Sequence, residues 1–430
     1  MAIASLGCKV NQCDGSEIGR GLADRGFSLV PFESSADVYI VNTCTVTRRT
    51  DYQSRQLIRR AARRNPQALI VVTGCYAQTS PGEVAQIPGV RLVMGNDRKA
   101  QLPEIISEML NGHEMAPECP PQGADDQHTS YGNLPGHTRA FLKIQDGCNA
   151  SCTYCIVPAA RGASRSISFD EVKRRMFLLG QSGYRELVLT GIHLGTWGED
   201  LSPPFNLLDL IAWADLERPQ ERIRLSSLEP TEVSGKIAPY MRAGGILCPH
   251  LHIPLQSGDD RILAAMGRPY DRAFFRERLR GLFAALPDIA IGLDVMAGFP
   301  GEDERAFQNT LALLTEIPVA YFHVFPYSPR PGTKAATMSG QVAEKVKKER
   351  AAILRSLGVK NRESYAKKFI GRGLSVLIEG KTADGAEVFG LAANYLPVVI
   401  KKNRTPLMIN SIVGVIPEYY ANGRLYGRLS

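Results

Sequence analysis

The stretch that decides the fold is Gly147–Cys155, with the sequence GCNASCTYC, which places three cysteines within eight residues. These are Cys148, Cys152 and Cys155, and the spacing CxxxCxxC has no fourth cysteine and no nearby histidine. Structural zinc takes four protein ligands, and a ferredoxin-type cluster takes four cysteines. Three thiolates instead hold three irons of a [4Fe–4S] cluster and leave the fourth iron without a protein ligand.

An iron with an open position can bind a small molecule. S-adenosylmethionine offers an amino and a carboxylate group that together chelate such an iron, and one electron passed into its sulfonium releases a 5′-deoxyadenosyl radical. The alternatives are a three-cysteine zinc site completed by a distant histidine, or unrelated core thiols. The compact spacing favours the open-iron cluster.

Bulk properties limit the class of protein. A chain of 430 residues is too long for one core, so we expect two to four domains. The start MAIASLGCKV lacks the pattern of a signal peptide, and no uncharged run of about 18 apolar residues suggests a membrane span. We therefore expect a cytoplasmic protein without a membrane partner. Cysteines stay mostly reduced in the cytoplasm, so the nine cysteines of this chain favour metal or redox chemistry over disulfides.

The pattern of apolar runs predicts an α/β protein. Residues 1–112 contain four short β-branched runs separated by stretches of helical length; the runs are AIASL, DVYIVN, ALIVVTG and VRLVMGN. This alternation indicates an N-terminal open parallel α/β sheet domain. Residues 113–136 are rich in Pro, Gly and Asp, as is typical of a linker. A second alternation over residues 137–335 predicts a central (βα)6-type partial barrel.

The remainder of the chain predicts two further parts. Residues 336–369 form a basic connecting helix, and residues 370–430 contain short strands broken by Gly and Asn, which suggest a small antiparallel β-barrel. The six strand candidates of the central barrel are Phe141–Gln145, Glu186–Thr190, Ile223–Ser227, Leu251–Leu255, Ile289–Val295 and Tyr321–Phe325.

A second set of cysteines is spread through the first domain. Cys8, Cys44 and Cys75 each come just past a predicted strand, one βα unit apart. The carboxyl ends of parallel strands line one edge of a sheet, so these three thiols are able to converge on a second cluster. The alternative is that they are buried apolar cysteines. Cys13 and Cys248 lie outside the pattern.

Basic residues gather in two segments. The chain has a net charge of +8, and Arg48–Arg64 holds seven arginines against one aspartate. Arg330–Arg372 holds twelve Lys or Arg against three Glu. Such runs are either solvated helix faces or contacts to a polyanion such as nucleic acid.

With these motifs in view, the chain resembles the radical S-adenosylmethionine methylthiotransferases over nearly its whole length. The matching stretches include LGCKVNQ, NTCTVT, TGCYAQ, GCNASCTYCIVPAARG, LTGIHLGTWGED, LSSLEP, HIPLQSGDDRILAAMGRPY and DVMAGFPGE. GCKVNQ and LTGIHLG are most similar to the MtaB type of this family. Cys13 departs from the family pattern, in which a bulkier residue is usual, but leaves the three ligand positions intact.

The resemblance implies cofactors, mechanism and substrate. Two [4Fe–4S] clusters and S-adenosylmethionine are expected, one cluster on Cys8, Cys44 and Cys75 in the first domain and the catalytic one in a radical barrel. One adenosylmethionine methylates sulfur on the first cluster, and a second is cleaved at the catalytic cluster, whose radical attacks C2 of the base. The substrate is N6-threonylcarbamoyladenosine beside the tRNA anticodon. A C-terminal TRAM domain binds RNA.

Contacts to adenosylmethionine are expected at the ends of the barrel strands. The candidates are Thr190, Gly191, Glu229, Gln256, Ser257, Asp294 and Gly298. Each is alternatively a turn-stabilising polar residue or a packing glycine. Arg161 and Arg268 either bind a carboxylate or phosphate or form structural salt bridges.

The basic segments and the family resemblance also predict the binding partners. The predicted tRNA contacts are Arg48, Arg55, Arg59, Arg60, Lys345, Lys347, Lys348, Lys401, Lys402 and Arg404. The reaction also needs an electron donor and a sulfur source. Alternative functions are the same chemistry on isopentenyladenosine in tRNA or on a ribosomal-protein aspartate, and a non-catalytic iron–sulfur sensor that binds RNA.

Overall fold

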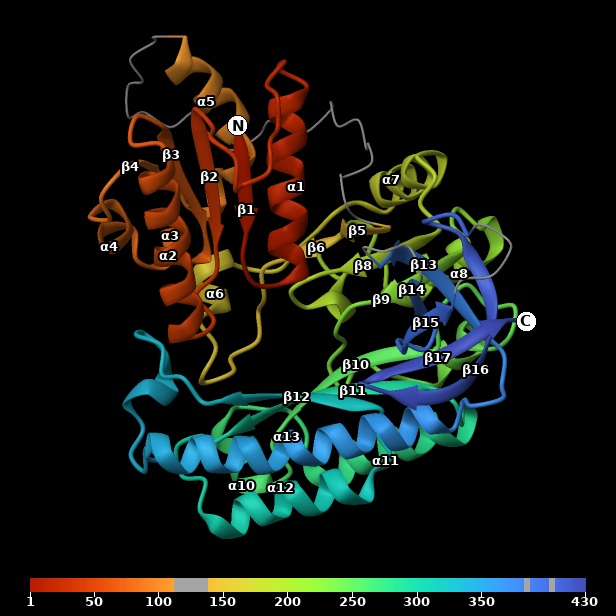
Figure 1. The fold of residues 1–430 in the computed structure, drawn as a ribbon. Helices are drawn as coiled ribbons and strands as arrows, with labels where there is room; N and C mark the ends of the chain where they lie inside the picture. The colour runs from red at the N-terminus through yellow and green to blue at the C-terminus, as the bar shows by residue number, and fades with distance from the viewer. Residues whose placement is uncertain (112–137, 383–386, 402–406) are drawn as a thin grey trace. The chain divides into compact units, whose positions relative to one another are not determined.

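A computed structural model describes residues 1–111, 138–382, 387–401 and 407–430 (Figure 1). The predicted linker 113–136 and two predicted RNA contacts, Lys402 and Arg404, lie outside the described residues. The chain divides into two compact units. The first unit comprises Met1–Leu134, Asp146–Ala150 and Cys155–Ala163; the second comprises Pro135–Gln145, Ser151–Tyr154 and Ser164–Ser430.

The first unit is built on a parallel sheet of four strands in the order β1-β2-β3-β4, which confirms the predicted open α/β sheet. The strands are β1 (Ala2–Ser5), β2 (Val38–Thr43), β3 (Leu69–Gly74) and β4 (Val90–Val93). The helices are α1 (Lys9–Ala23), α2 (Arg48–Arg64), α3 (Cys75–Thr79), α4 (Pro81–Ala85), η1 (Asn96–Gln101), α5 (Leu102–Leu110) and α6 (Val157–Arg161).

Helices cover both faces of this sheet, which explains why β2 is buried along its whole length. On one face Tyr39 and Val41 of β2 belong to a cluster that includes Ile58 of α2. On the other face Val38 and Ile40 of β2 pack in a cluster that contains residues of α1 and α5. Near-continuous apolar strands are the expected signature of a parallel sheet covered in this way.

The second unit begins with six parallel strands in two groups of three. β5 (Arg139–Lys143), β8 (Glu186–Thr190) and β9 (Arg222–Leu225) form one sheet, and β10 (His250–Gln256), β11 (Ala290–Ala297) and β12 (Tyr321–Pro326) form the other. Two isolated parallel bridges, Ile223 to Leu247 and Ser227 to His252, join the groups. The predicted six-stranded partial barrel is confirmed.

Helices and short turns lie between these strands and after the last of them. They are α7 (Phe169–Gln181), η2 (Leu194–Thr196), α8 (Leu207–Glu217), η3 (Gly235–Ile237), α9 (Ala238–Met241), α10 (Asp260–Ala265), α11 (Arg272–Ala285), α12 (Glu304–Glu316) and η4 (Lys334–Thr337). The two-residue strands β6 (Gln145–Asp146) and β7 (Arg165–Ser166) flank the three-cysteine segment in the sequence. None of the helices that the structure describes is long and apolar enough to span a bilayer.

The long basic helix α13 (Glu344–Lys367) leads to a closed five-stranded barrel. Its strands are β13 (Leu374–Lys381), β14 (Glu387–Ala392), β15 (Pro397–Lys401), β16 (Ile412–Ala421) and β17 (Arg424–Leu429). Four of the five pairings are antiparallel, as expected, but β15 pairs with β17 in parallel. The barrel closes because this last strand turns back alongside β15.

A buried ion triad joins this barrel to the sheet of β5, β8 and β9. The Glu186 carboxylate accepts hydrogen bonds from Nε of Arg222 and Nε of Arg224, both at 2.7 Å. Arg222 Nη2 also donates to the carbonyl of Leu391 at 3.0 Å, and Arg224 Nη1 donates to that of Ala393 at 2.9 Å. Burial would raise the pKa of Glu186, but the charges of Arg224 and Arg222 outweigh it and lower that pKa to about 2.

The triad predicts a large loss of stability for Glu186→Gln. Removing one partner of a buried ion pair costs about 3–5 kcal/mol, because the arginines stay buried without their counter-charge. Urea unfolding followed by tryptophan fluorescence reports on the second unit, which contains both tryptophans. The Glu186 contribution is present above its unfolded pKa of about 4.3. This contribution is lost as pH falls toward 2. The unfolding free energy of Glu186→Gln should therefore fall less steeply over this pH range than that of the wild type.

The matched control is Glu418→Gln in the exposed Glu418–Arg428 pair, which should change the unfolding free energy by less than about 0.5 kcal/mol. Equal effects of the two substitutions would show that the Glu186 triad does not stabilise the unit.

Candidate functional site

The cysteines of the first unit lie at the carboxyl ends of three adjacent strands. Cys44 directly follows β2, Cys75 directly follows β3, and Cys8 comes three residues after β1. Gly7 has a φ of +91°, and a Cβ there would lie 2.5 Å from Sγ of Cys44. A Cβ on Gly74, where φ is +96°, would lie 2.3 Å from the carbonyl oxygen of the residue before Cys44. Glycine at both positions lets the three loops approach closely.

The electrostatics of these thiols show their proximity. Burial raises the pKa of the Cys44 thiol to about 11, and charges on Cys75 and Cys8 raise it further. The surrounding protein also raises the pKa of Cys8 by desolvation, although the residue keeps an exposed surface. Nδ2 of Asn96 donates to Sγ of Cys75 at 3.6 Å.

The three thiols suit a cluster better than a single ion. In the described part of the chain, their sulfur atoms do not all lie within 4.8 Å of one another, as ligands of one ion would. A [4Fe–4S] cluster gives each cysteine its own iron, so its ligands are farther apart. Three soft donors at one sheet edge therefore fit the cluster that the family resemblance implies.

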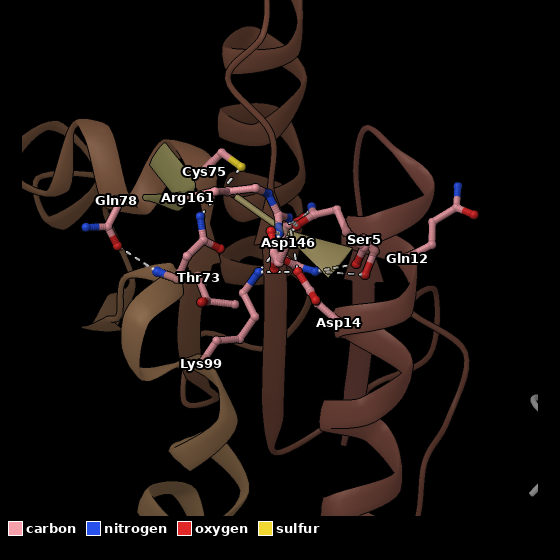
Figure 2. Close-up of polar contacts among 12 residues, drawn as sticks. Ser5, Gln12, Asp14, Thr73, Cys75, Gln78, Lys99, Asp146 and Arg161 are labelled. Atoms are coloured by element: carbon pink, nitrogen blue, oxygen red, sulfur yellow. Dashed lines mark hydrogen bonds and ion pairs between the residues drawn. The ribbon is translucent and has the colours of Figure 1, made fainter. Parts of the chain in front are cut away.

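A buried polar network lies beside Cys75 (Figure 2). Arg161 from α6 donates to Asp14 Oδ2 through Nη2 at 3.0 Å and to Asp146 Oδ2 through Nη1 at 2.9 Å. Lys99 from η1 also pairs with Asp14 Oδ2, at 2.9 Å. Oδ1 of Asn11 accepts from Arg161 at 3.1 Å and from Lys99 at 3.4 Å. Of the two roles that the sequence left open for Arg161, the structure shows the salt bridge.

This network connects to the cysteine loops through Asn11. Its Nδ2 donates to the carbonyl of Leu6 at 2.6 Å and to that of Thr43 at 3.2 Å, next to Cys8 and Cys44 in sequence. Burial opposes the charge of Arg161, but negative charge on Cys75, Asp14, Asp146 and Cys8 raises its pKa above the ordinary value. Arg161 is therefore a permanent buried cation beside the sulfur atoms.

The segment Cys148–Cys155 is held by its ends. Gly147 has a φ of +73°, and a Cβ there would lie 1.9 Å from the carbonyl oxygen of Ala163, so only glycine fits. The amide of Cys148 donates to the carbonyl of Gly162 at 3.1 Å. Cys148 and Cys155 belong to the first unit and Cys152 belongs to the second. All three are half-buried.

Within the second unit, Cys152 contacts a buried arginine. Nη1 of Arg268 donates to Sγ of Cys152 at 3.3 Å, while Nη2 pairs with the carboxylate of Glu229. Nε of Arg268 donates to the hydroxyl of Tyr270 at 3.0 Å. Burial raises the pKa of Glu229, and the charge of Arg268 opposes this rise. Arg268 thus links a predicted cluster ligand to a predicted adenosylmethionine contact.

Two predicted adenosylmethionine contacts lie where β8 ends. Thr190 is buried, and its carbonyl accepts from the amide of Ile144 at 3.0 Å. A Cβ on Gly191 would lie 2.8 Å from Oε1 of Gln145, so this glycine permits close packing. Their predicted contacts to the cofactor remain predictions.

Other candidates at strand ends also have partners inside the protein. Gln256 has a φ of +65° at an irregularity in the β10–β11 pairing. Ser257 is buried, with its hydroxyl 3.4 Å from that of Thr310. A Cβ on Gly298 would lie 2.3 Å from Cγ of Lys347, which explains the glycine by packing. Asp294 on β11 accepts hydrogen bonds from histidines on both neighbouring strands.

The predicted RNA contacts on α2 differ in exposure. Arg48, Arg59 and Arg60 are exposed, whereas Arg55 is half-buried and donates to the hydroxyl of Tyr76 at 2.9 Å. The helix begins at a capping box formed by Thr47 and Thr50, which fixes the start of the basic segment close to Cys44 in sequence.

On α13 the structure separates the predicted contacts. Lys345 and Lys348 are exposed, but Lys347 is buried and pairs with Glu344 at 2.8 Å. Its neighbours in the helix project outward while its own side chain packs inward, so the burial argues against a phosphate contact for Lys347. Lys401 is exposed at the end of β15, and its Nζ lies 5.7 Å from the ring centre of Tyr419.

Comparisons with known proteins agree with this architecture. Residues 1–95 match the model of "Uncharacterized protein family UPF0004", and residues 142–314 match that of the "Radical SAM superfamily". The chain is 40% identical over 426 residues to "Threonylcarbamoyladenosine tRNA methylthiotransferase MtaB" of Bacillus subtilis (strain 168), which covers 96% of this chain and 93% of that protein. The protein of the same name from Aquifex aeolicus (strain VF5) is 39% identical, with 88% and 92% covered.

More distant relatives carry another name. A "tRNA-2-methylthio-N(6)-dimethylallyladenosine synthase" of Bartonella quintana (strain Toulouse) is 29% identical, with 95% of this chain and 92% of that protein covered. Among solved structures, the radical S-adenosylmethionine methyltransferase TsrM from Kitasatospora setae has a TM-score of 0.58 at 16% identity, covering 75% of this chain and 74% of that one. This likeness shows the fold alone.

The buried network predicts that Arg161→Met destabilises the first unit. Asp14 and Asp146 would lose a shared cation, at a cost of about 3 kcal/mol or more. Hydrogen exchange of amides in β2 measures this cost within the first unit. Arg59→Met, an exposed arginine of the same unit, should leave the exchange rates within about threefold of the wild type. Unchanged protection in Arg161→Met would show that the network does not stabilise the sheet.

Proposed function

Because the chain belongs to the radical S-adenosylmethionine methylthiotransferase family, and to its MtaB type, we propose that it inserts a methylthio group at C2 of N6-threonylcarbamoyladenosine beside the tRNA anticodon. The observation that carries this proposal is the near full-length identity to relatives named for that reaction. The convergence of Cys8, Cys44 and Cys75 at one sheet edge supports it from the chain's own residues.

The cofactors are two [4Fe–4S] clusters and S-adenosylmethionine. Cys148, Cys152 and Cys155 would hold the catalytic cluster, and Cys8, Cys44 and Cys75 the auxiliary cluster. Three protein ligands leave each cluster an iron for a small molecule or for sulfur. When bound, these groups supply the one-electron chemistry needed to functionalise C2, an unactivated carbon that acid–base catalysis does not reach.

The chain's own residues would bind and orient. Arg268 donates to Cys152 and pairs with Glu229, so it orients both side chains. Thr190, Gly191, Gln256, Ser257, Asp294 and Gly298 remain candidate contacts to adenosylmethionine. Arg161 and Asn11 fix the loops that carry the auxiliary ligands.

Each part of the chain would have its own task. Residues 1–112 would carry the auxiliary cluster and residues 137–335 the radical chemistry, with 113–136 as linker. Residues 336–369 would connect them to an RNA-binding TRAM barrel at 370–430. tRNA is the substrate partner, and an electron donor and a sulfur source complete the reaction. We place the reaction in the cytoplasm, where tRNA is modified.

A second candidate is the same chemistry on isopentenyladenosine, which is also called dimethylallyladenosine. Relatives at 29–30% identity are named for its methylthio product. The higher identity to the threonylcarbamoyladenosine group favours the first candidate. A ribosomal-protein substrate has no support among these relatives. A sensor without catalysis would not need the barrel motifs.

The modified nucleoside distinguishes the two candidate substrates. tRNA from cells lacking this gene should gain a methylthio increment on threonylcarbamoyladenosine only when the gene is restored, as measured by mass spectrometry of digested nucleosides. An increment on dimethylallyladenosine instead would select the second candidate. No change in any tRNA nucleoside would contradict both.

Single cysteine variants separate the two clusters. Cys75→Ala should still cleave adenosylmethionine to 5′-deoxyadenosine but lose sulfur insertion, whereas Cys152→Ala should lose both, because only the second removes a ligand of the catalytic cluster. Cys13→Ala, a buried cysteine outside both sets, should retain both activities. Sulfur insertion by Cys75→Ala would refute the auxiliary site.

Salt dependence tests the RNA contacts. Each phosphate contact contributes about −0.7 to −0.9 to the slope of log affinity against log salt. The double variant Arg59→Gln, Arg60→Gln should therefore flatten the slope for tRNA by roughly 1.4 to 1.8. Arg278→Gln with Arg280→Gln on α11 is the charge-matched control and should leave the slope unchanged. Equal slopes in all three proteins would exclude α2 from the interface.

A further inference from the structure

Three polar side chains share one face of neighbouring strands in the second unit. Asp294 on β11 pairs in register with His323 on β12. Oδ1 of Asp294 lies 3.0 Å from Nε2 of His252 on β10 and 3.3 Å from Nδ1 of His323. Among the described residues, the ligand atoms of these three all lie within 4.8 Å of one another. The proposed function assigns no task to either histidine.

The two histidines are held differently. His252 is nearly buried, and its Nδ1 lies 3.3 Å from the hydroxyl of Tyr321, so both of its ring nitrogens have partners. The side chain of His323 is 55% exposed and contacts Asp294 through Nδ1, which turns Nε2 away from that carboxylate. Burial opposes the charge of Asp294, but hydrogen bonds from His252 and His323 lower its pKa below the usual range. An imidazole donates from both of its ring nitrogens when it is doubly protonated.

An exposed aromatic ring lies beside His323. Phe325 is two residues further along β12, on the same face, and 43% exposed. Its ring centre lies 6.2 Å from that of His323, at an interplanar angle of 72°. The faces of parallel sheets are normally covered, so core packing does not explain an exposed phenylalanine here. A base stacks on such a ring with a contribution of about 1–3 kcal/mol.

We propose that this face of β12 recognises the modified base, with Phe325 stacking against the adenine and His323, oriented by Asp294, donating a hydrogen bond through Nε2 to the carboxylate of the threonylcarbamoyl substituent. The inference rests on the proposed function and makes His323 a specificity-determining residue. The threonyl carboxylate is an anion, whereas a dimethylallyl substituent is a hydrocarbon. A charge-assisted hydrogen bond therefore separates the two substrates.

Two histidines and a carboxylate are also a ligand set for a divalent metal ion. Here Asp294 Oδ1 lies at hydrogen-bonding distance from both imidazoles, so protons bridge the three groups without an ion. The exposed Phe325 beside the triad also suits a base rather than a metal ion alone. These two observations favour the anionic base substituent, and metal content becomes an outcome of the test.

The test is RNA binding by the anaerobically purified, cluster-loaded protein. The probes are anticodon stem-loops carrying threonylcarbamoyladenosine or its carboxyl methyl ester, which removes the charge and keeps the shape. The wild type should bind the acid about tenfold more tightly than the ester, as expected for one hydrogen bond to a charged group. His323→Ala should bind both probes alike. A preference for the acid that survives in His323→Ala overturns the proposal.

Substitutions of the ring test the stacking separately. Phe325→Ala should weaken binding of both probes by about tenfold and preserve the ratio between acid and ester, and Phe325→Trp should restore affinity. The control is Phe177→Ala on α7, which removes a phenylalanine of similar exposure (41%). It should change neither the affinity for the probes nor the ratio between acid and ester. Full affinity in Phe325→Ala refutes the stacking contact.

Metal analysis of the same preparations completes the test. Stoichiometric zinc or manganese in the wild type that is absent from His323→Ala would identify a metal site and overturn the proposal. Failure of this inference is distinguishable from failure of the proposed function. If the wild type methylthiolates threonylcarbamoyladenosine while His323→Ala keeps its preference for the acid, only the inference fails.

Discussion

The close approach of three strand ends in the first unit is the constraint on which the rest of the account depends. Gly7 and Gly74 occupy positive-φ positions where a side chain would collide with Cys44 or with the residue before it. Without these glycines the loops that carry Cys8, Cys44 and Cys75 would move apart, and three thiolates would no longer meet one cluster. The sheet provides the direction of the strands, but these glycines determine the spacing at its edge.

Buried charge stabilises both units, and each charge is balanced locally. Arg161 and Lys99 face Asp14 and Asp146 beside the auxiliary cysteines, and Glu186 faces two arginines beneath the C-terminal barrel. Burying an ion costs several kcal/mol, so such groups persist only where their partners are fixed. The first network fixes the cysteine loops, and the second fixes the C-terminal barrel, for which we propose a role in RNA binding. Both therefore stabilise elements that the reaction needs.

The parallel sheets, the strand-end position of the cysteines and the family were predictable from the sequence, because β-branched runs and local spacing carry that information. The networks were not, because Asp14, Lys99 and Arg161 are distant in sequence and meet only in the fold. The burial of Lys347 was missed for a related reason: a basic run does not show which of its members faces inward. The parallel pairing of β15 with β17 and the His323 triad likewise depend on strand register, which periodicity leaves open.

The central claim is that the thiolates of the first unit hold a cluster of their own. The most direct measurement is ⁵⁷Fe Mössbauer spectroscopy of the variant in which Cys148, Cys152 and Cys155 are all alanine, purified anaerobically. The account predicts one remaining [4Fe–4S] cluster, with about four irons per chain. Protein without iron, or with zinc in its place, would contradict the account, because the convergent cysteines would then not form an iron–sulfur site.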